Sequence, residues 1–290
     1  MTTRGKLAVG CARRLALVAS AAGLALAAAA PGAGAAVTIG QLGTPPGANC
    51  EVLVDRVQPA VTGGNSYVLP STGGVQEWTI TSWSSSPPTG PTTWKMKIFR
   101  QVVPGTFTAI AQDDPRTLAG GVLNTFPTSL QARAGDILGL NVIAGARPCS
   151  FVVTGDSYLR TGSSDLTPGQ AGSFPIATPN RRLNISAVAE ATNTFDLKKG
   201  KRNTKKGIGR LVAEDLPNPG ELVLRGKGLK KVSKNVSGSD DEVTLKVRAK
   251  GGKKRKLQSS GKVGAKPKVT FTPNEGEPNT ESKKLKLKQN

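Results

Sequence analysis

Apolar and polar residues alternate along short segments of the chain from about residue 50 onward. In the segment that begins at Trp94, the apolar residues Trp94, Met96 and Ile98 are separated by basic ones. Side chains of a strand point alternately to its two faces, so Lys95 and Lys97 fall on the opposite face. The pattern predicts a strand with one buried face and one face in water.

Residues 37–192 hold many such segments, separated by Gly, Pro, Asn or Asp. Gly135-Asp136 indicates a turn, and the apolar run 137–143 that follows it predicts a buried strand. No segment here favours a helix. Short strands at regular spacing predict a β-sandwich, and we expect the jelly-roll type. The other predicted strands are 51–57, 75–83, 94–100, 106–111, 122–126, 129–132, 150–153 and 181–189.

Alternation continues through residues 193–290. Val243–Lys250 alternates without a break, and Leu285–Lys288 does the same. Such patterning predicts an antiparallel sheet with one buried face and one strongly cationic face. We expect a small immunoglobulin-like sandwich. The alternative is partial disorder, because aromatic residues are few and 251–256 is a polar, basic stretch that we expect to form a turn.

The first 36 residues have the pattern of a signal peptide. Basic residues precede the uncharged apolar run Leu15–Ala30, and small residues follow it. We therefore expect cleavage after Ala35 or Ala36 and a secreted, extracellular protein. The alternative is an uncleaved membrane anchor, although the run is short of the about 20 residues that a span needs. No later segment is apolar enough to cross a membrane.

Charge is distributed unevenly along the chain. Residues 37–192 carry 10 basic and 9 acidic residues, whereas residues 193–290 carry 26 basic and 10 acidic ones. This asymmetry predicts two domains with different surfaces, 37–192 and 193–290. A strongly basic surface attracts polyanions. Our candidate residues for that role are Lys253, Lys254, Arg255 and Lys256.

Export favours an anionic cell-envelope polymer or an acidic polysaccharide as the partner. Nucleic acid is less favoured, because aromatic residues do not alternate with the basic ones and lysine outnumbers arginine. The alternative is that the lysines are solvated and protect exposed sheet edges from pairing. The sequence predicts no particular oligomeric state.

Two of the three cysteines, Cys50 and Cys149, remain after the predicted cleavage. In an oxidising compartment such a pair forms a disulfide, which over a loop this long contributes about 4–5 kcal/mol. The alternative is two buried free thiols. The chain has no histidine, which excludes His-based triads, Cys–His dyads and most transition-metal sites. We assign no catalytic residue, metal site or cofactor.

Carboxylates near predicted loop ends are another candidate for chemistry. Asp113, Asp114, Asp136, Asp156 and Asp165 belong to this group. They could form a calcium site or a glycosidase pair. The alternative is an ordinary role in turns, where aspartate is a preferred residue.

Tryptophan rings could stack on sugars. Trp78 and Trp94 fall on the apolar faces of their strands, which favours core packing. Trp83 lies at a strand end beside the Ser- and Pro-rich stretch 84–88. It is therefore our candidate for an exposed, glycan-stacking ring.

Several stretches carry a resemblance to known proteins. They are 80–83, 123–128, 133–140, 149–151 and 182–187 in the first half, and 219–232, 269–273 and 278–287 in the second. The first set resembles a jelly-roll-like sandwich domain of secreted actinobacterial proteins of unknown function. The second resembles the lysine-rich, immunoglobulin-like C-terminal β-domains of such proteins. The resemblance implies fold, export and an appended surface module, and it brings no catalytic residues.

Our functional hypothesis is an exported, non-enzymatic two-domain β protein. It would associate with the cell envelope or with an extracellular anionic polymer or glycan. The alternative is a carboxylate-based polysaccharide hydrolase on the jelly-roll scaffold. Two carboxylates about 5–10 Å apart in a cleft would favour the hydrolase.

Overall fold

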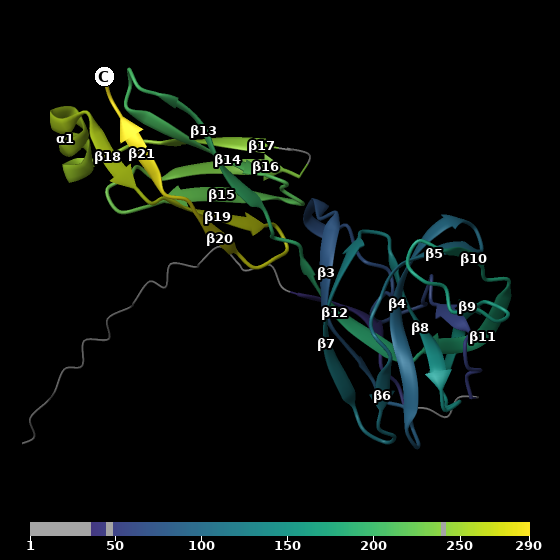
Figure 1. The fold of residues 1–290 in the computed structure, drawn as a ribbon. Helices are drawn as coiled ribbons and strands as arrows, with labels where there is room; N and C mark the ends of the chain where they lie inside the picture. The colour runs from purple at the N-terminus through teal and green to yellow at the C-terminus, as the bar shows by residue number, and fades with distance from the viewer. Residues whose placement is uncertain (1–35, 45–48, 239–241) are drawn as a thin grey trace, which may run out of the picture. The chain divides into compact units, whose positions relative to one another are not determined.

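The fold is almost entirely antiparallel β-sheet (Figure 1). A computed structural model describes residues 36–44, 49–238 and 242–290. Within these residues there is one α-helix, α1 (Gly251–Ser260), and one short 3-10 segment, η1 (Thr72–Gly74). The prediction of an all-β sandwich is confirmed, while the jelly-roll and immunoglobulin-like subtypes stay predictions. Apart from Ala36, the predicted signal peptide lies outside the described residues, and its cleavage after Ala35 or Ala36 stays a prediction.

Two sheets enclose the core of the first half. In sheet order, the four-stranded sheet contains β1 (Val37–Gln41), β12 (Ile185–Ala191), β3 (Glu77–Ser85) and β7 (Asn124–Arg133). The larger sheet contains β10 (Ala171–Ser173), β5 (Thr106–Gln112), β4 (Thr92–Val103), β8 (Ile137–Ala144), β2 (Asp55–Val57), β9 (Ser150–Arg160) and β11 (Ile176–Leu183), with β6 (Arg116–Leu118) paired to β4. The chain passes from one sheet to the other between β3 and β4 and again between β7 and β8. Such crossings are the connections of a sandwich.

The predicted buried strand after Gly135-Asp136 is β8. Leu138, Leu140 and Val142 are fully buried within it. Gly135 has a φ of +87°, a conformation that glycine adopts without strain, and this turns the chain into the strand. The prediction for this stretch is confirmed.

One prediction for strand β4, the exposure of its second face, is wrong. Its second face was predicted to lie in water, yet Lys97 on that face is fully buried. The reason is a tertiary one: the segment 161–170 covers this face, and Lys97 Nζ donates a hydrogen bond to Leu166 O at 2.8 Å. Alternation in the sequence cannot distinguish water from a covering loop.

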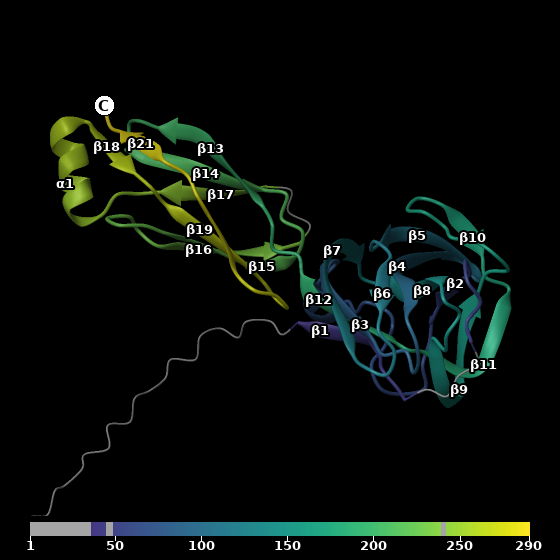
Figure 2. The ribbon, with the colours of Figure 1, turned by 60° about the horizontal axis from the view of Figure 1, so that its bottom comes forward.

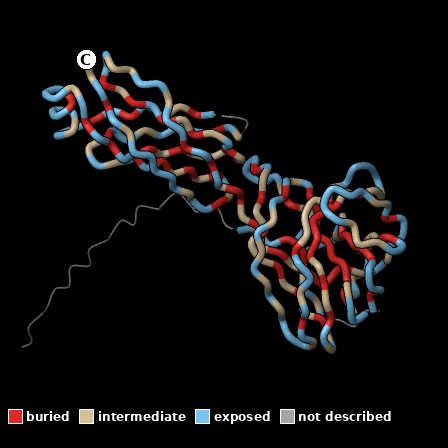
Figure 3. Tube along the Cα trace, viewed as in Figure 1, coloured by how far each residue is buried: buried red, intermediate tan, exposed pale blue. Residues whose placement is uncertain are grey.

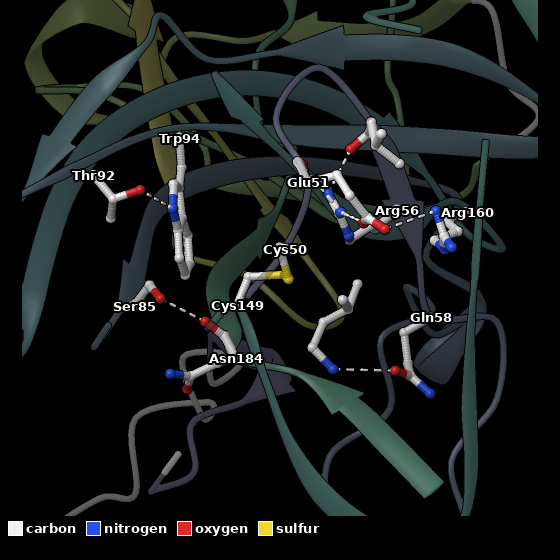
Figure 4. Close-up of a disulfide and its surroundings, with 12 residues drawn as sticks. Cys50, Glu51, Arg56, Gln58, Ser85, Thr92, Trp94, Cys149, Arg160 and Asn184 are labelled. Carbon is white, nitrogen blue, oxygen red and sulfur yellow. Dashed lines mark hydrogen bonds and ion pairs between the residues drawn. A yellow bond between two sulfur atoms is a disulfide. The ribbon is translucent and has the colours of Figure 1, made fainter. Parts of the chain in front are cut away.

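A disulfide ties the start of the first half to the start of β9 (Figure 4). Cys50 and Cys149 are bonded, with a Cα–Cα distance of 5.8 Å. Next to Cys50, Glu51 accepts ion pairs from Arg56 at 2.8 Å and from Arg160 at 3.3 Å. The predicted disulfide is confirmed.

The second half is built from three smaller sheets. The first has the order β13 (Asp196–Asn203), β14 (Ile208–Glu214) and β17 (Glu242–Val247). The second has the order β16 (Val232–Ser237), β15 (Pro219–Arg225), β19 (Lys268–Pro273) and β20 (Asn279–Ser282), and the third pairs β18 (Lys262–Ala265) with β21 (Leu285–Lys288). Figure 2 shows the first two sheets facing each other. Buried and exposed residues alternate along their strands, as Figure 3 shows.

The basic stretch at 251–256 forms the start of helix α1, so the predicted turn is wrong. Lys, Arg, Gln and Leu are good helix formers. Leu257 is the buried residue of this helix and belongs to the hydrophobic cluster of the second half. Gly261, with a φ of +66°, ends the helix in the left-handed conformation that glycine favours.

The buried apolar residues form two separate clusters. One extends from Ile39 to Ala191 and the other from Phe195 to Leu287. The boundary between them coincides with the change in charge near residue 192. This separation supports a division into 37–192 and 193–290, which stays a prediction. In the described part of the chain, no helix has the length and apolar character that crossing a membrane requires.

Candidate polyanion-binding surface

Two cations face each other on neighbouring strands of the second half. Arg210 on β14 is paired directly with Lys246 on β17. Neither forms an ion pair with an acid among the described residues. Like charges directly opposite each other destabilise a sheet. An external anion bound between them would remove this repulsion.

These two residues line a hollow of about 480 Å³, which we call the β16–β17 hollow. It lies between β17, the edge strand of one sheet, and β16, the edge strand of the other. Its lining contains no acidic residue. The basic residues that line it are Arg210, Lys230, Lys231, Lys234, Lys246 and Arg248.

A second hollow, of about 600 Å³, lies over β13, β14 and β21, and we call it the β13–β14 hollow. Arg210 lines both hollows, so the two are neighbours on either side of its side chain. Gly200 lies opposite Arg210, and a Cβ there would lie 3.1 Å from the Arg210 Cβ. The glycine therefore leaves room for the arginine. The basic residues of this hollow are Lys199, Lys201, Arg202, Arg210 and Lys286.

Together the two hollows form what we call the cationic surface. Among the described residues of the second half, the ion pair is Lys198 with Glu214. Hydrogen bonding to Glu214 raises the pKa of Lys198. The basic residues of the cationic surface have no such acidic partner among the described residues, so their field extends into solvent and attracts anions.

Helix α1 lies beside this surface and carries the four residues assigned from the sequence. Lys254 lines a hollow of about 320 Å³ that it shares with Lys230 and Arg248 of the β16–β17 hollow. Lys253 donates a hydrogen bond to Gly264 O at 2.7 Å. Arg255 and Lys256 are exposed and line none of the three hollows. The structure thus places one of the four next to the cationic surface.

Sequence reasoning missed the centre of this surface at Arg210. The alternation in 243–250 places Lys246 and Arg248 on an outward face, and the sequence alone indicates this. The meeting of β16 with β17 is a contact between two sheets, and strand patterns do not predict which edges approach each other.

The candidate carboxylates lie in separate ion pairs. Asp113 binds Arg116, Asp136 binds Arg100, Asp156 binds Arg182 and Asp165 binds Lys95. For Asp113, burial opposes ionisation, but hydrogen bonds from Arg116 and Trp83 lower the pKa of the carboxyl below its usual value. Asp114 is exposed. These residues do not face one another across a cleft, so their arrangement gives no support to a carboxylate pair of hydrolase type.

Trp83 is fully buried, so the prediction of an exposed, glycan-stacking ring is wrong. Its Nε1 donates to Asp113 Oδ2 at 2.8 Å, and its ring centroid lies 4.9 Å from that of Phe126. The physical reason is a register shift in β3 between Ile80 and Ser82. A bulge changes which residues point inward, and Trp83 consequently joins Trp78 and Trp94 in the core, where the latter two were expected.

Fold and surface together define an all-β sandwich protein with a cationic surface on its second half. Comparison with known proteins finds no family model and no curated protein that matches this chain. The resemblance to secreted actinobacterial sandwich proteins therefore stays a prediction. Among the described residues, no group of three or more acidic or cysteine side chains is placed to hold a metal ion.

Proposed function

We propose that this protein is exported and binds an anionic polymer of the cell envelope or extracellular matrix through the cationic surface. The polymer would lie along the β16–β17 hollow and pass Arg210 into the β13–β14 hollow. Recognition would be electrostatic and would not depend on the order of units in the polymer, since lysine ammonium groups act as point charges. The first half would contribute a stable scaffold.

The observation that carries this proposal is the position of Arg210. Edge protection alone would explain the lysines on the edge strands β16 and β17, because lysine hinders pairing of exposed sheet edges. Arg210 lies on β14, which is the central strand of its sheet and has no edge to protect. Its placement opposite Lys246, without an acidic partner among the described residues, favours a binding role for this surface.

The test compares two variants of the full chain that lose equal charge. In the hollow variant, Lys230, Lys231, Lys234 and Lys246 are replaced by Gln. In the control variant, the exposed Lys262, Lys266, Lys268 and Lys283, which line none of the three hollows, are replaced by Gln. The probes are a poly(glycerol phosphate), a polyuronate and, as a neutral polymer, dextran.

The hollow variant should bind both anionic polymers at least tenfold more weakly than the control variant, and none of the proteins should bind dextran. Equal losses in the two variants would mean that net charge, and not this surface, determines binding. No binding of wild-type protein at low salt would leave the lysines as protection for sheet edges.

A further inference from the structure

A lysine, an asparagine and an aspartate lie together in the interior of the first half. Lys97 lies on β4, Asn141 on β8 and Asp55 on β2, which are neighbouring strands in this order. Asn141 is paired directly with Asp55 in the sheet register. All three side chains are fully buried. Burying a charged and a polar side chain together is costly unless they are satisfied or serve a function.

One oxygen of Asp55 contacts both of the other side chains. Asp55 Oδ1 accepts a hydrogen bond from Lys97 Nζ at 2.7 Å and another from Asn141 Nδ2 at 2.6 Å. Its second oxygen accepts the Leu166 N–H at 2.8 Å. The amine nitrogen of the lysine and the amide nitrogen of the asparagine therefore share one proton acceptor.

The site is shielded from water by the covering segment 161–170. Asn141 Nδ2 also donates to Ser164 O at 3.1 Å. Asn141 Oδ1 is buried and has no hydrogen-bond partner among the described residues. Two positions beyond Lys97, Phe99 packs on Phe174 with ring centroids 5.4 Å apart.

Asp55 is protonated more easily than an ordinary aspartate. Burial raises the pKa of the Asp55 carboxyl, even though the hydrogen bond and the charge of Lys97 act in the opposite direction. Asp55 is therefore a better proton acceptor than an ordinary aspartate, and its Oδ1 contacts Lys97 Nζ. Transfer of a proton from Nζ to Asp55 leaves the lysine nitrogen with a lone pair, which makes it a nucleophile.

We propose that Lys97 and Asn141 become joined by an intramolecular amide bond, with Asp55 transferring the proton. The Lys97 Nζ lone pair attacks Asn141 Cγ and forms the new C–N bond. Asp55 takes a proton from Nζ and gives one to Nδ2, so the Cγ–Nδ2 bond breaks and ammonia leaves. One primary amine and one primary amide become one secondary amide and ammonia, Asp55 ends as it began, and nothing is oxidised or reduced.

Asp165 is the competing partner of the lysine, since its Oδ1 lies 2.6 Å from Lys97 Nζ. Burial opposes ionisation of Asp165, but hydrogen bonds from Lys95 and Lys97 lower the pKa of its carboxyl. An ionised carboxylate is a poor electrophile, so an amine does not readily form an amide bond with it. Asn141 is therefore the electrophile, and Asp165 is a neighbouring counter-ion.

The product would be a second covalent tie in the first half. It would join β4 to β8, whereas the disulfide joins Cys50 to Cys149. A bond between buried strands limits the unfolded chain in the way that a disulfide does, and reducing agents would not break it.

The test is the intact mass of the folded full chain after reduction and denaturation, compared with the mass calculated from its observed N-terminus. Wild-type protein should be 17 Da lighter, which is the mass of one ammonia. Proteolytic digestion should then yield a branched peptide joining Lys97 to Asn141. Lys97→Arg, Asn141→Ala and Asp55→Asn should each restore the calculated mass. The matched control is Asp156→Asn, which changes another buried aspartate with a basic partner and should keep the loss of 17 Da.

Wild-type protein of full calculated mass would overturn the proposal, and this result does not depend on the folding of any variant. A loss of 18 Da with Lys97 joined to Asp165 would overturn the assignment of Asn141. A loss of 17 Da that fragmentation places elsewhere, or that persists in Asn141→Ala, would overturn it as well.

Discussion

Trp83 is a core residue whose indole N–H is bound by a buried carboxylate. Trp83→Ala should lower the free energy of unfolding by about 3–5 kcal/mol, because it opens a cavity and removes a hydrogen bond to Asp113. Denaturant unfolding measures this, and the exposed Val122→Ala should change stability by less than about 0.5 kcal/mol. A Trp83→Ala variant as stable as Val122→Ala would contradict the core assignment.

Asp156 provides a pH-dependent contribution to stability. Burial opposes its ionisation, but hydrogen bonds from Thr62 and Arg182 lower the pKa of its carboxyl below the usual value. Since the folded pKa is the lower one, the contribution is complete above the unfolded pKa of about 4 and is lost as pH falls through the folded pKa.

Asp156→Asn should therefore lower stability by about 1–3 kcal/mol at pH 7 and by less at pH 3. Urea unfolding of both proteins between pH 3 and pH 7 measures the difference. A difference that stays constant over this range would show that the charge of Asp156 does not contribute.

At the level of elements, the disulfide closes the first half between the segment before β2 and the start of β9. Thiol labelling of the denatured, unreduced mature protein should find no free thiol. The double variant Cys50→Ser, Cys149→Ser should be less stable by about 2–5 kcal/mol. Two labelled thiols in the wild-type protein would contradict the bond.

The pattern of the sequence predicted strands well and their surroundings less well. The strand β8 was recognisable as an apolar run after the turn at Gly135, and β17 was recognisable because one of its faces is apolar. The buried Lys97 was not, since its face is covered by a loop distant in sequence. Trp83 was misplaced because a bulge in β3 changes the phase of alternation, which no periodicity reveals in advance.

The candidate site was predictable in charge but not in shape. Lysine clusters indicated the second half, and α1 replaced a predicted turn because its side chains favour a helix once Leu257 can be buried. The hollow itself depends on two sheet edges meeting and on Gly200 leaving room for Arg210. Both are tertiary features that single-sequence patterns do not contain.

At the level of the whole molecule, the separate clusters predict separate unfolding. The chain has three tryptophans, Trp78, Trp83 and Trp94, and all lie in the first cluster. Phe271→Ala should destabilise the second half by about 3–5 kcal/mol. The unfolding transition that tryptophan fluorescence reports should keep its midpoint. Circular dichroism should show an additional unfolding transition at a lower denaturant concentration. A matching shift in fluorescence would show that the two halves unfold together and would contradict the division near residue 192.

The α1 cluster should make a smaller contribution to binding than the hollow lysines do. Replacing Lys253, Lys254, Arg255 and Lys256 with Gln should weaken polymer binding and leave the fold intact, because Gln favours helix and Leu257 is retained. Binding assays and circular dichroism measure the two effects. A loss larger than that of the hollow variant would move the centre of the site to α1.

The most direct test of the central claim is the salt dependence of polymer binding by the full chain. Each neutralised anion releases a counterion, so the logarithm of the affinity should fall linearly with the logarithm of salt concentration. The wild-type slope should be steep, and the hollow variant should show a flatter slope than the control variant of equal charge. Affinity that persists unchanged through high salt would contradict binding by the cationic surface.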